Sequence, residues 1–201
     1  MKRLKTLHTL SEAGKVSSGE LRVIGPNDTP PEAYFITRWR TLRKPLGLPL
    51  GTERLPDDNE AIHSCIENDG IIVAVGRAHL IPEDSAGAMQ DHSGKGASTC
   101  PSFTPLEGDS DFPPVDSLRP AFHIRQMGTL SEWRRQGFAA KILVALERAC
   151  VETWKCNSGW LQARVEAIPF YQSQGWIVFG EEYQIEGVGP HFSMWKNLGG
   201  I

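Results

Sequence analysis

The residue that most constrains the fold of this chain is Gly137, which separates a charged turn from a strongly patterned segment. After this glycine, apolar residues recur at the spacing i, i+3, i+4 and i+7, which is typical of a helix with one buried face. These apolar residues are Ala139, Ile142, Leu143, Leu146, Ala149 and Cys150. The charged residues between them are expected to face water: Lys141, Glu147, Arg148 and Glu152. The pattern predicts an amphipathic helix that starts at Gly137 and is ended by Gly159.

Shorter patterns predict strands and helices on both sides of this helix. Pro31 suits the first turn of a helix and opens one that runs to Arg43. Asn68-Asp69-Gly70 lies between two apolar runs, and Asp-Gly favours the positive φ angles of a hairpin turn. Strands are expected at residues 21–24, 61–67, 71–80, 121–130, 160–165, 176–185 and 191–198, and a short helix at residues 167–174. Because strands alternate with helices and hairpins, we predict an α/β or α+β fold with one mixed sheet.

Two segments carry no such pattern. Residues 82–120 are rich in Gly, Ser, Pro and Asp, and a loop of this length in a compact domain is usually functional or disordered. We expect a mobile insertion between two strands; the alternative is a lid over a substrate. Residues 1–20 lack the continuous apolar stretch of a signal peptide, so we expect a flexible tail, with organelle targeting as the alternative. Residues 21–201 then form one domain that contains the insertion.

The composition limits the kinds of partner. The chain has 21 Lys and Arg against 24 Asp and Glu, so its net charge of −3 favours neither nucleic acid nor an anionic membrane as a partner. Any binding site for an anion must therefore be local. The longest apolar run, residues 71–75, is far too short to cross a bilayer. The four cysteines form no CxxC pair, which favours reduced thiols and a cytoplasmic protein.

The turn before the helix has the chemistry of a phosphate site. The first turn of a helix leaves backbone N–H groups without partners, and the helix dipole adds about half a positive charge there. A glycine lets the backbone approach an anion, and Arg134 and Arg135 add fixed charge. A GxxxxGK[ST] loop is absent, and so is a GxGxxG fingerprint. From this turn alone, a pyrophosphate site and an ordinary solvated helix start remain equally open.

Several motifs in order resemble those of the GCN5-related N-acetyltransferases. Arg134-x-x-Gly137-x-Ala139 resembles the family pattern Q/R-x-x-G-x-G/A, between a strand and a long helix. AIPFYQSQGW at residues 167–176 is similar to A-x-x-x-[FL]-Y-x-x-x-G-F. The final segment resembles a branch ending in G-x-x-H-x-x-M, and residues 34–54 resemble its R-x-x-V-L-R-x-P-x-G segment. The resemblance covers residues 21–198 except the insertion, and implies a mostly antiparallel, twisted sheet, splayed between its fourth and fifth strands and flanked by helices.

The resemblance also implies a cosubstrate and the residues that bind it. Acetyl-CoA would be bound by the strand end, the turn and the helix start, with no metal. The residues carried over are Met127, Gly128, Thr129, Arg134, Arg135, Gln136, Gly137, Phe138, Ala139, Ala140 and Tyr171. Tyr171 matches the family tyrosine that protonates the departing thiolate, with core packing as the alternative. The chain departs from the family at Arg164, where asparagine is common, and at Trp133, where tyrosine is usual.

An amine acceptor must lose a proton, so a general base or a water relay is expected. The candidates are Glu132, His123, Glu166, Glu182 and His191. His191 matches the branch histidine, and its alternative role is a part-buried histidine bonded to a backbone carbonyl. His63, His79 and His123 lie on neighbouring predicted strands, but no carboxylates stand at matching positions, so we expect no metal site.

The implied activity is direct transfer of an acetyl group from acetyl-CoA to a primary amine, without a covalent carrier at Cys100. The alternative is a non-catalytic module that senses acyl-CoA or docks a partner on the same fold. The acceptor site would be formed by residues 39–54 and 186–191. These segments carry charges of both signs, so they indicate no particular acceptor. A small-molecule amine is favoured over a protein, and the fold is compatible with a homodimer.

Overall fold

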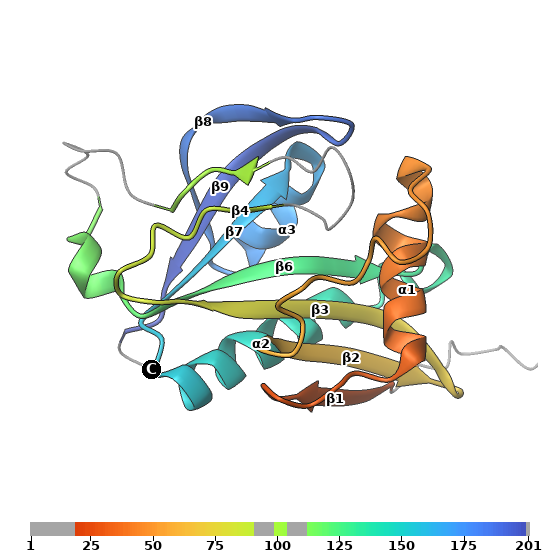
Figure 1. Ribbon diagram of the computed structural model, residues 1–201. Helices are drawn as coiled ribbons and strands as arrows, with labels where there is room; N and C mark the ends of the chain where they lie inside the picture. Colours follow the sequence, from red (N-terminus) through yellow and green to blue (C-terminus); the bar gives the residue numbers. More distant parts are fainter. Residues whose placement is uncertain (1–18, 91–98, 104–111, 200–201) are drawn as a thin grey trace, which may run out of the picture.

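The described residues of the protein are built around one mixed sheet of seven strands (Figure 1). The structure is a computed structural model that describes residues 19–90, 99–103 and 112–199. The strands of the sheet, in spatial order, are β1 (Glu20–Ile24), β2 (Ile62–Asn68), β3 (Ile71–Ile81), β6 (Ala121–Thr129), β7 (Ser158–Arg164), β9 (Gly189–Asn197) and β8 (Ile177–Ile185). Neighbours run antiparallel except for β6 and β7, which are parallel. The predicted fold class is confirmed.

The hairpin between β2 and β3 turns where the sequence predicts it. Asp69 and Gly70 have φ angles of 50° and 77°, and a two-residue hairpin turn of type I′ requires positive φ at both of these positions. The turn sets the register that pairs Asn68 with Ile71. The hairpin prediction is therefore confirmed, including the two turn residues.

The sheet opens between its fourth and fifth strands, as the resemblance implies. β6 and β7 pair only at Ala121–His123 with Ser158–Trp160. Beyond these pairs the two strands diverge (Figure 1), and within the described ranges no strand pairs with the far part of β6 on that side. The gap gives a ligand access to the backbone of β6.

Helices cover both faces of the sheet. α2 (Phe138–Trp154) packs on β2 and β3 through one set of alternating residues, which includes Ile66 and Ala74. α1 (Glu32–Leu42) lies on the other face, against Cys65 and Val75. Successive strand residues point to opposite faces, so these adjacent positions place the two helices on opposite sides. The remaining helical segments are α3 (Ile168–Ser173) and the short turns at Lys44–Leu46, Val115–Leu118, Ser131–Trp133 and Val165–Ala167.

Two details of the α2 prediction are wrong. Glu147 is buried, because its carboxylate accepts hydrogen bonds from Trp176 Nε1 at 2.9 Å and from Lys196 Nζ at 2.7 Å. The helix also ends before Gly159: Lys155 adopts a left-handed φ of 56° and terminates it. Gly159 lies inside β7, where a Cβ atom would stand 2.5 Å from the ring of Phe122.

A buried ion network fixes α1 and the loop after it to the sheet. Arg38 of α1 and Arg77 of β3 are both fully buried. Asp58, from the loop, accepts hydrogen bonds from Arg38 at 3.0 and 2.7 Å and lies 3.1 Å from Arg77 Nε. Asp57 adds an ion pair of 2.6 Å to Arg77. A single loop segment therefore neutralises two buried guanidinium groups on two different elements.

The segment between β3 and β6 contributes its own hydrophobic cluster where the structure describes it. Two short strands, β4 (Met89–Gln90) and β5 (Thr99–Cys100), pair antiparallel. Phe103 is fully buried, with its ring 5.2 Å from Trp160 and 6.5 Å from Phe179. Residues 91–98 and 104–111 of the predicted insertion, and residues 1–18 of the predicted tail, lie outside the described part of the chain.

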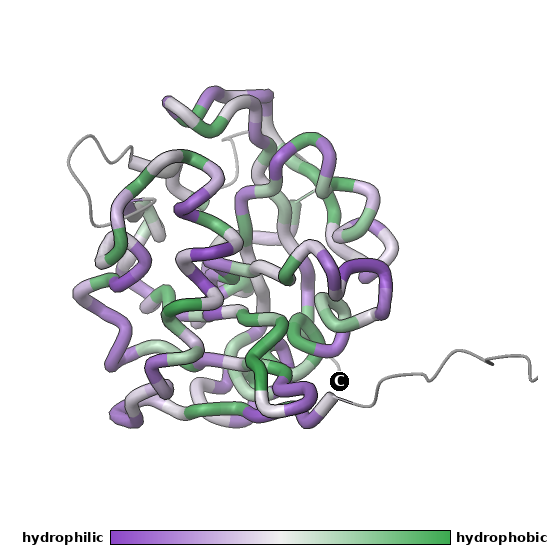
Figure 2. Tube along the Cα trace, turned by 90° about the vertical axis from the view of Figure 1, so that its right-hand side faces the viewer, coloured by the Kyte–Doolittle hydropathy of each residue, from purple (hydrophilic) through white to green (hydrophobic). Residues whose placement is uncertain are grey.

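Hydrophobic residues are spread through the fold in short stretches interrupted by hydrophilic ones (Figure 2). In the described ranges, no helix combines the length and the apolar character needed to span a bilayer.

Candidate functional site

The turn that leads into α2 presents an open helix start. Arg135 and Gly137 have φ angles of 64° and 80°, so the chain turns sharply before the helix begins at Phe138. No side chain caps this end of the helix, and its first turn contains no acidic residue. The free N–H groups and the positive end of the dipole therefore face outward with two exposed arginines beside them.

A pocket of about 510 Å³ lies in front of this turn. Its walls come from the end of β6, the turn, the start of α2 and α3: Met127, Gly128, Thr129, Trp133, Arg134, Arg135, Gly137, Phe138, Ala139, Ala140, Ala167, Phe170, Tyr171 and Gln174. A Cβ atom built on Gly137 would meet no atom within 4 Å. Glycine is therefore required at this position by its left-handed φ and not by packing within the protein, and the space in front of it is open.

Nearly all of the residues carried over for acetyl-CoA line this one pocket, and Gln136 does not. Arg134 reaches back along the chain, and its Nε donates to the carbonyl oxygen of Thr129 at 3.3 Å. Sequence reasoning missed Phe170 of α3 and Gln174, the residue that follows α3, both of which line the pocket. Phe170 and Gln174 are four residues apart, a spacing that places two side chains on the same side of a helical segment.

The end of β6 is shaped by a bulge and by a glycine. Gln126 has a φ of 55°, and the register between β3 and β6 shifts opposite it. Such a bulge re-aims the residues that follow it. At Gly128 a Cβ atom would stand 2.2 Å from Thr41 Oγ1, so this glycine lets α1 approach the strand.

Tyr171 stands where two pockets meet. Its hydroxyl lies 3.8 Å from Met127 Sδ, and its ring packs edge-on against Phe170 and Trp176. Burial raises the pKa of Tyr171 to about 12, so the phenol keeps its proton at neutral pH. The side chain can therefore donate a proton or a hydrogen bond into either pocket.

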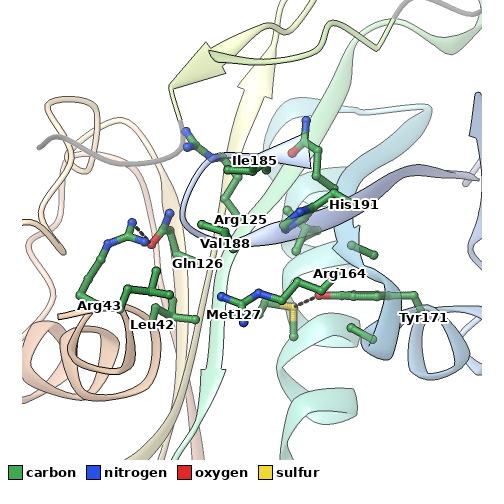
Figure 3. Close-up of a pocket in the computed structure, with 15 residues that line it drawn as sticks. Leu42, Arg43, Arg125, Gln126, Met127, Arg164, Tyr171, Ile185, Val188 and His191 are labelled. Atoms are coloured by element: carbon green, nitrogen blue, oxygen red, sulfur yellow. Dashed lines mark hydrogen bonds between the residues drawn. The ribbon is translucent and has the colours of Figure 1, made fainter. Parts of the chain in front are cut away.

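The second pocket, of about 220 Å³, lies on the other side of Tyr171 (Figure 3). It shares Met127, Ala167 and Tyr171 with the first. Its other lining residues are Leu42, Arg43, Leu46, Ile124, Arg125, Gln126, Gln162, Ala163, Arg164, Ile185, Val188 and His191. The shared residues make the two pockets neighbouring compartments of one site.

His191 faces this second pocket from the start of β9 (Figure 3). It is 5% exposed, and its Nδ1 lies 2.8 Å from the carbonyl oxygen of Gly189. A carbonyl only accepts, so Nδ1 carries the proton and Nε2 of the neutral ring is an acceptor. The ring of Tyr183 stacks against it at 6.2 Å.

The other candidate bases lie outside both pockets. His123 is fully buried, and burial holds its pKa well below the ordinary value. Glu132 and Glu166 are exposed and lie next to Arg40 and Arg164 respectively. Glu182 is exposed on β8 and accepts a hydrogen bond from Gln184. Only His191 among the five candidates lines either pocket.

The three strand histidines do not form one cluster. His63 bonds to Tyr34 and to the carbonyl of Asp58, whereas the rings of His79 and His123 pack edge to face with centres 4.9 Å apart. Burial lowers the pKa of His63 to about 4 and that of His79 to about 3. Within the described residues, no group of three or more His, Cys, Asp or Glu side chains could hold a metal ion.

The predicted acceptor segments, residues 39–54 and 186–191, contribute five residues to the second pocket: Leu42, Arg43, Leu46, Val188 and His191. Sequence reasoning missed the polar residues of the neighbouring strands, Arg125, Gln126 and Gln162. Arg43 Nη2 donates to Gln126 Oε1 at 2.7 Å, Arg125 donates to the carbonyl oxygen of Gln90, and Gln162 contacts His123. Arg43 directly follows α1, the other residues belong to β6 and β7, and no local motif relates them. Their convergence depends on strand register and on the bulge at Gln126.

The sequence matches one known domain family. Residues 115–198 match the model of the acetyltransferase (GNAT) domain. The uncharacterized N-acetyltransferase YitI of Bacillus subtilis strain 168 is 31% identical over 78 residues, which cover 39% of this chain and 52% of YitI. The chain spans about half the length of this curated relative.

Solved structures show the same fold. An acyl-CoA N-acyltransferase from Pseudomonas aeruginosa superposes with a TM-score of 0.60 at 16% identity, over 89% of this chain and 99% of that chain. ElaA from Escherichia coli gives a TM-score of 0.57 at 17% identity, over 89% and 99%. The similarity extends well beyond the 84 residues that the domain model matches.

Proposed function

We propose that this chain, which belongs to the GCN5-related N-acetyltransferase superfamily, transfers an acetyl group from acetyl-CoA directly to a primary amine. One observation carries the proposal. The pocket at the open start of α2 and the pocket that contains His191 meet at Tyr171 and Met127. A donor and an acceptor placed in the two compartments would come together beside a phenol that keeps its proton.

The larger pocket suits the cosubstrate. The uncapped N–H groups of α2, with Arg134 and Arg135, would bind the pyrophosphate. The unpaired edge of β6 beyond His123 would receive the pantetheine arm. Bound acetyl-CoA supplies an acetyl group activated as a thioester.

The smaller pocket suits the acceptor and its proton. Tyr171 holds a proton at its hydroxyl oxygen, where a departing thiolate needs one. His191, with Nε2 as an acceptor, would take the proton that the attacking amine loses. The two side chains thus divide the acid and base work between α3 and β9.

Calorimetric titration with acetyl-CoA tests the donor site. We expect wild-type protein to bind and an Arg135→Glu variant to bind at least tenfold more weakly, because the substitution reverses the charge beside the phosphates. Arg148→Glu is the matched control: it makes the same charge change on α2, at a side chain that is 79% exposed and outside both pockets. Wild-type protein that does not bind acetyl-CoA would contradict the proposal.

Release of free thiol from acetyl-CoA, measured across a panel of primary amines, tests the transfer step. We expect at least one amine to accelerate thiol release and to gain the mass of one acetyl group. If acetyl-CoA binds but no amine or peptide is acetylated, the chain is a non-catalytic acyl-CoA sensor instead.

A further inference from the structure

We propose that the smaller pocket selects an amine that also carries a carboxylate, with an apolar group between or beside them. In chemical terms, the acceptor is a single free α-amino acid with an apolar side chain. This inference rests on the proposed function, because it names the acceptor class for the same site. Four features of the pocket support it.

The first feature is the charge of the lining. Arginines from three separate elements face the pocket: Arg43 after α1, Arg125 on β6 and Arg164 on β7 (Figure 3). None of the pocket-lining residues, all within the described ranges, is an aspartate or glutamate. A site built for a simple cationic amine would place a carboxylate near the ammonium group, whereas this lining attracts an anion.

Arg164 is the guanidinium best placed for the anion. In Figure 3 its side chain extends across the pocket from β7 toward Met127. Its nearest carboxylate belongs to Glu166, which is 73% exposed and stands 3.9 Å away, beyond hydrogen-bond distance. A guanidinium fork of this kind matches a carboxylate with two parallel hydrogen bonds.

The second feature is the amide of Gln162, two residues before Arg164 on the same face of β7. Its Oε1 lies 2.5 Å from His123 Nε2, which must donate because the carbonyl oxygen only accepts. The other end of the amide, Nε2, is buried and has no hydrogen-bond partner within the described part of the chain. A buried donor without a partner costs free energy, and because Gln162 lines the pocket, a turn of its amide toward the cavity would let a ligand oxygen accept from Nε2.

The third feature is the arrangement of these donors around the reacting centre. Arg164 pairs directly opposite His191 across β7 and β9, so the two side chains share one face of the sheet. Tyr171 closes the pocket toward the cosubstrate. A carboxylate on Arg164 and Gln162 would hold an adjacent amine within reach of His191. The nearby guanidinium groups would also lower the pKa of that amine and favour its reactive, neutral form.

The fourth feature is the size and apolar character of the remaining wall. Leu42 and Leu46 line one side, and Ile185 and Val188 line another. A cavity of about 220 Å³ admits a single amino acid rather than a folded chain. A peptide N-terminus carries an amide where the proposed acceptor carries its carboxylate, so the two classes can be told apart.

Matched ligand sets test the proposal. Leucine, methionine and phenylalanine are each compared with their amides and with their decarboxylated amines, by calorimetry against protein saturated with CoA. We expect at least one acid to bind at least tenfold more tightly than both of its neutral analogues. If every acid binds no better than its amine, or if the amides bind best, the proposal is overturned.

Substitutions of Arg164 test whether this residue causes the preference for a carboxylate. The preference is the ratio of the affinity for the acid to the affinity for its neutral analogue. Arg164→Gln should lower this ratio at least tenfold. Arg164→Lys should lower it less, because lysine keeps the positive charge but cannot form two parallel hydrogen bonds with a carboxylate. Arg148→Gln, at an exposed position outside the pocket, should leave the preference unchanged. Retention of the full preference in a folded Arg164→Gln variant would contradict the assignment.

The proposed function and the acceptor class can be contradicted separately. Failure of wild-type protein to bind acetyl-CoA contradicts the proposed function itself. Normal acetyl-CoA binding, together with acetylation of amines regardless of a carboxylate, contradicts only this inference.

Discussion

At the scale of single residues, the same amino acid type takes opposite roles according to what surrounds it. Burial raises the pKa of Tyr171 to about 12 and leaves it facing two cavities, so its proton is available to a ligand. Burial raises the pKa of Tyr34 to a similar value, but its hydroxyl donates to the carbonyl oxygen of Gly76 and bonds to His63. Only the position of Tyr171 next to open space suits it for chemistry.

We predict that Tyr171→Phe lowers kcat by about a hundredfold, because it removes a positioned proton donor. The affinity for acetyl-CoA, measured by calorimetry, should change less than twofold, since the ring still packs on Phe170 and Trp176. A variant that keeps the wild-type kcat would show that the hydroxyl serves packing alone. Thermal unfolding of the same variant checks that the fold is unchanged.

Glu147 shows why residue-level prediction fails on a helix. Its sequence position lies between apolar residues, but Trp176 and Lys196 from the last hairpin reach it. Periodicity indicates only which face of the helix a residue occupies. It does not indicate whether a hydrogen-bond donor from a distant part of the sequence contacts that residue. In the same way, Gly159 resembles a helix terminator in the sequence, whereas its real constraint is the ring of Phe122.

We predict that Glu147→Ala lowers the free energy of unfolding by about 2–3 kcal/mol, because a buried indole N–H and a largely buried ammonium lose their acceptor. Urea denaturation measures the change. Glu152→Ala, at an exposed position on the same helix, should change the free energy of unfolding by less than about 0.5 kcal/mol. Equal effects of the two substitutions would contradict the role assigned to Glu147.

At the scale of elements, local patterns predict the strands and helices well, and they predict the turn before α2 as a unit. That turn is contiguous in sequence, so its anion chemistry can be read from one stretch. The lining of the smaller pocket cannot be read this way. Arg43, Gln126 and Gln162 meet through the bulge in β6, the splay between β6 and β7 and the seating of α1, all of which depend on long-range packing.

The seating of α1 depends on one loop carboxylate. We predict that Asp58→Asn lowers the free energy of unfolding by about 3–5 kcal/mol, because it leaves Arg38 and Arg77 buried with too little negative charge. Chemical denaturation measures the loss. Asp116→Asn, an exposed aspartate at another helical turn, is the control and should have little effect. A loss below about 1 kcal/mol would contradict the role assigned to Asp58.

At the scale of the whole molecule, three neutral histidines buried in the sheet tie the stability of the fold to pH. Burial lowers the pKa of His63 to about 4 and of His79 to about 3, and it holds the pKa of His123 well below its ordinary value. In the unfolded chain each histidine titrates near its ordinary pKa of about 6.5. Below that pH the unfolded state therefore binds more protons than the folded state, and protonation favours unfolding.

We predict that the free energy of unfolding is constant through neutral pH and falls as the pH drops from 6.5 to 5, by about 1–2 kcal/mol for each buried histidine. Most carboxylates stay ionised in this window, so the histidines dominate the change. Urea denaturation at several pH values measures it. His79→Leu keeps the volume of the side chain approximately and removes one titrating group, so the fall should shrink by about a third. A free energy of unfolding that stays level down to pH 5 would mean that the sheet accepts these protons without opening, contrary to the burial of all three rings.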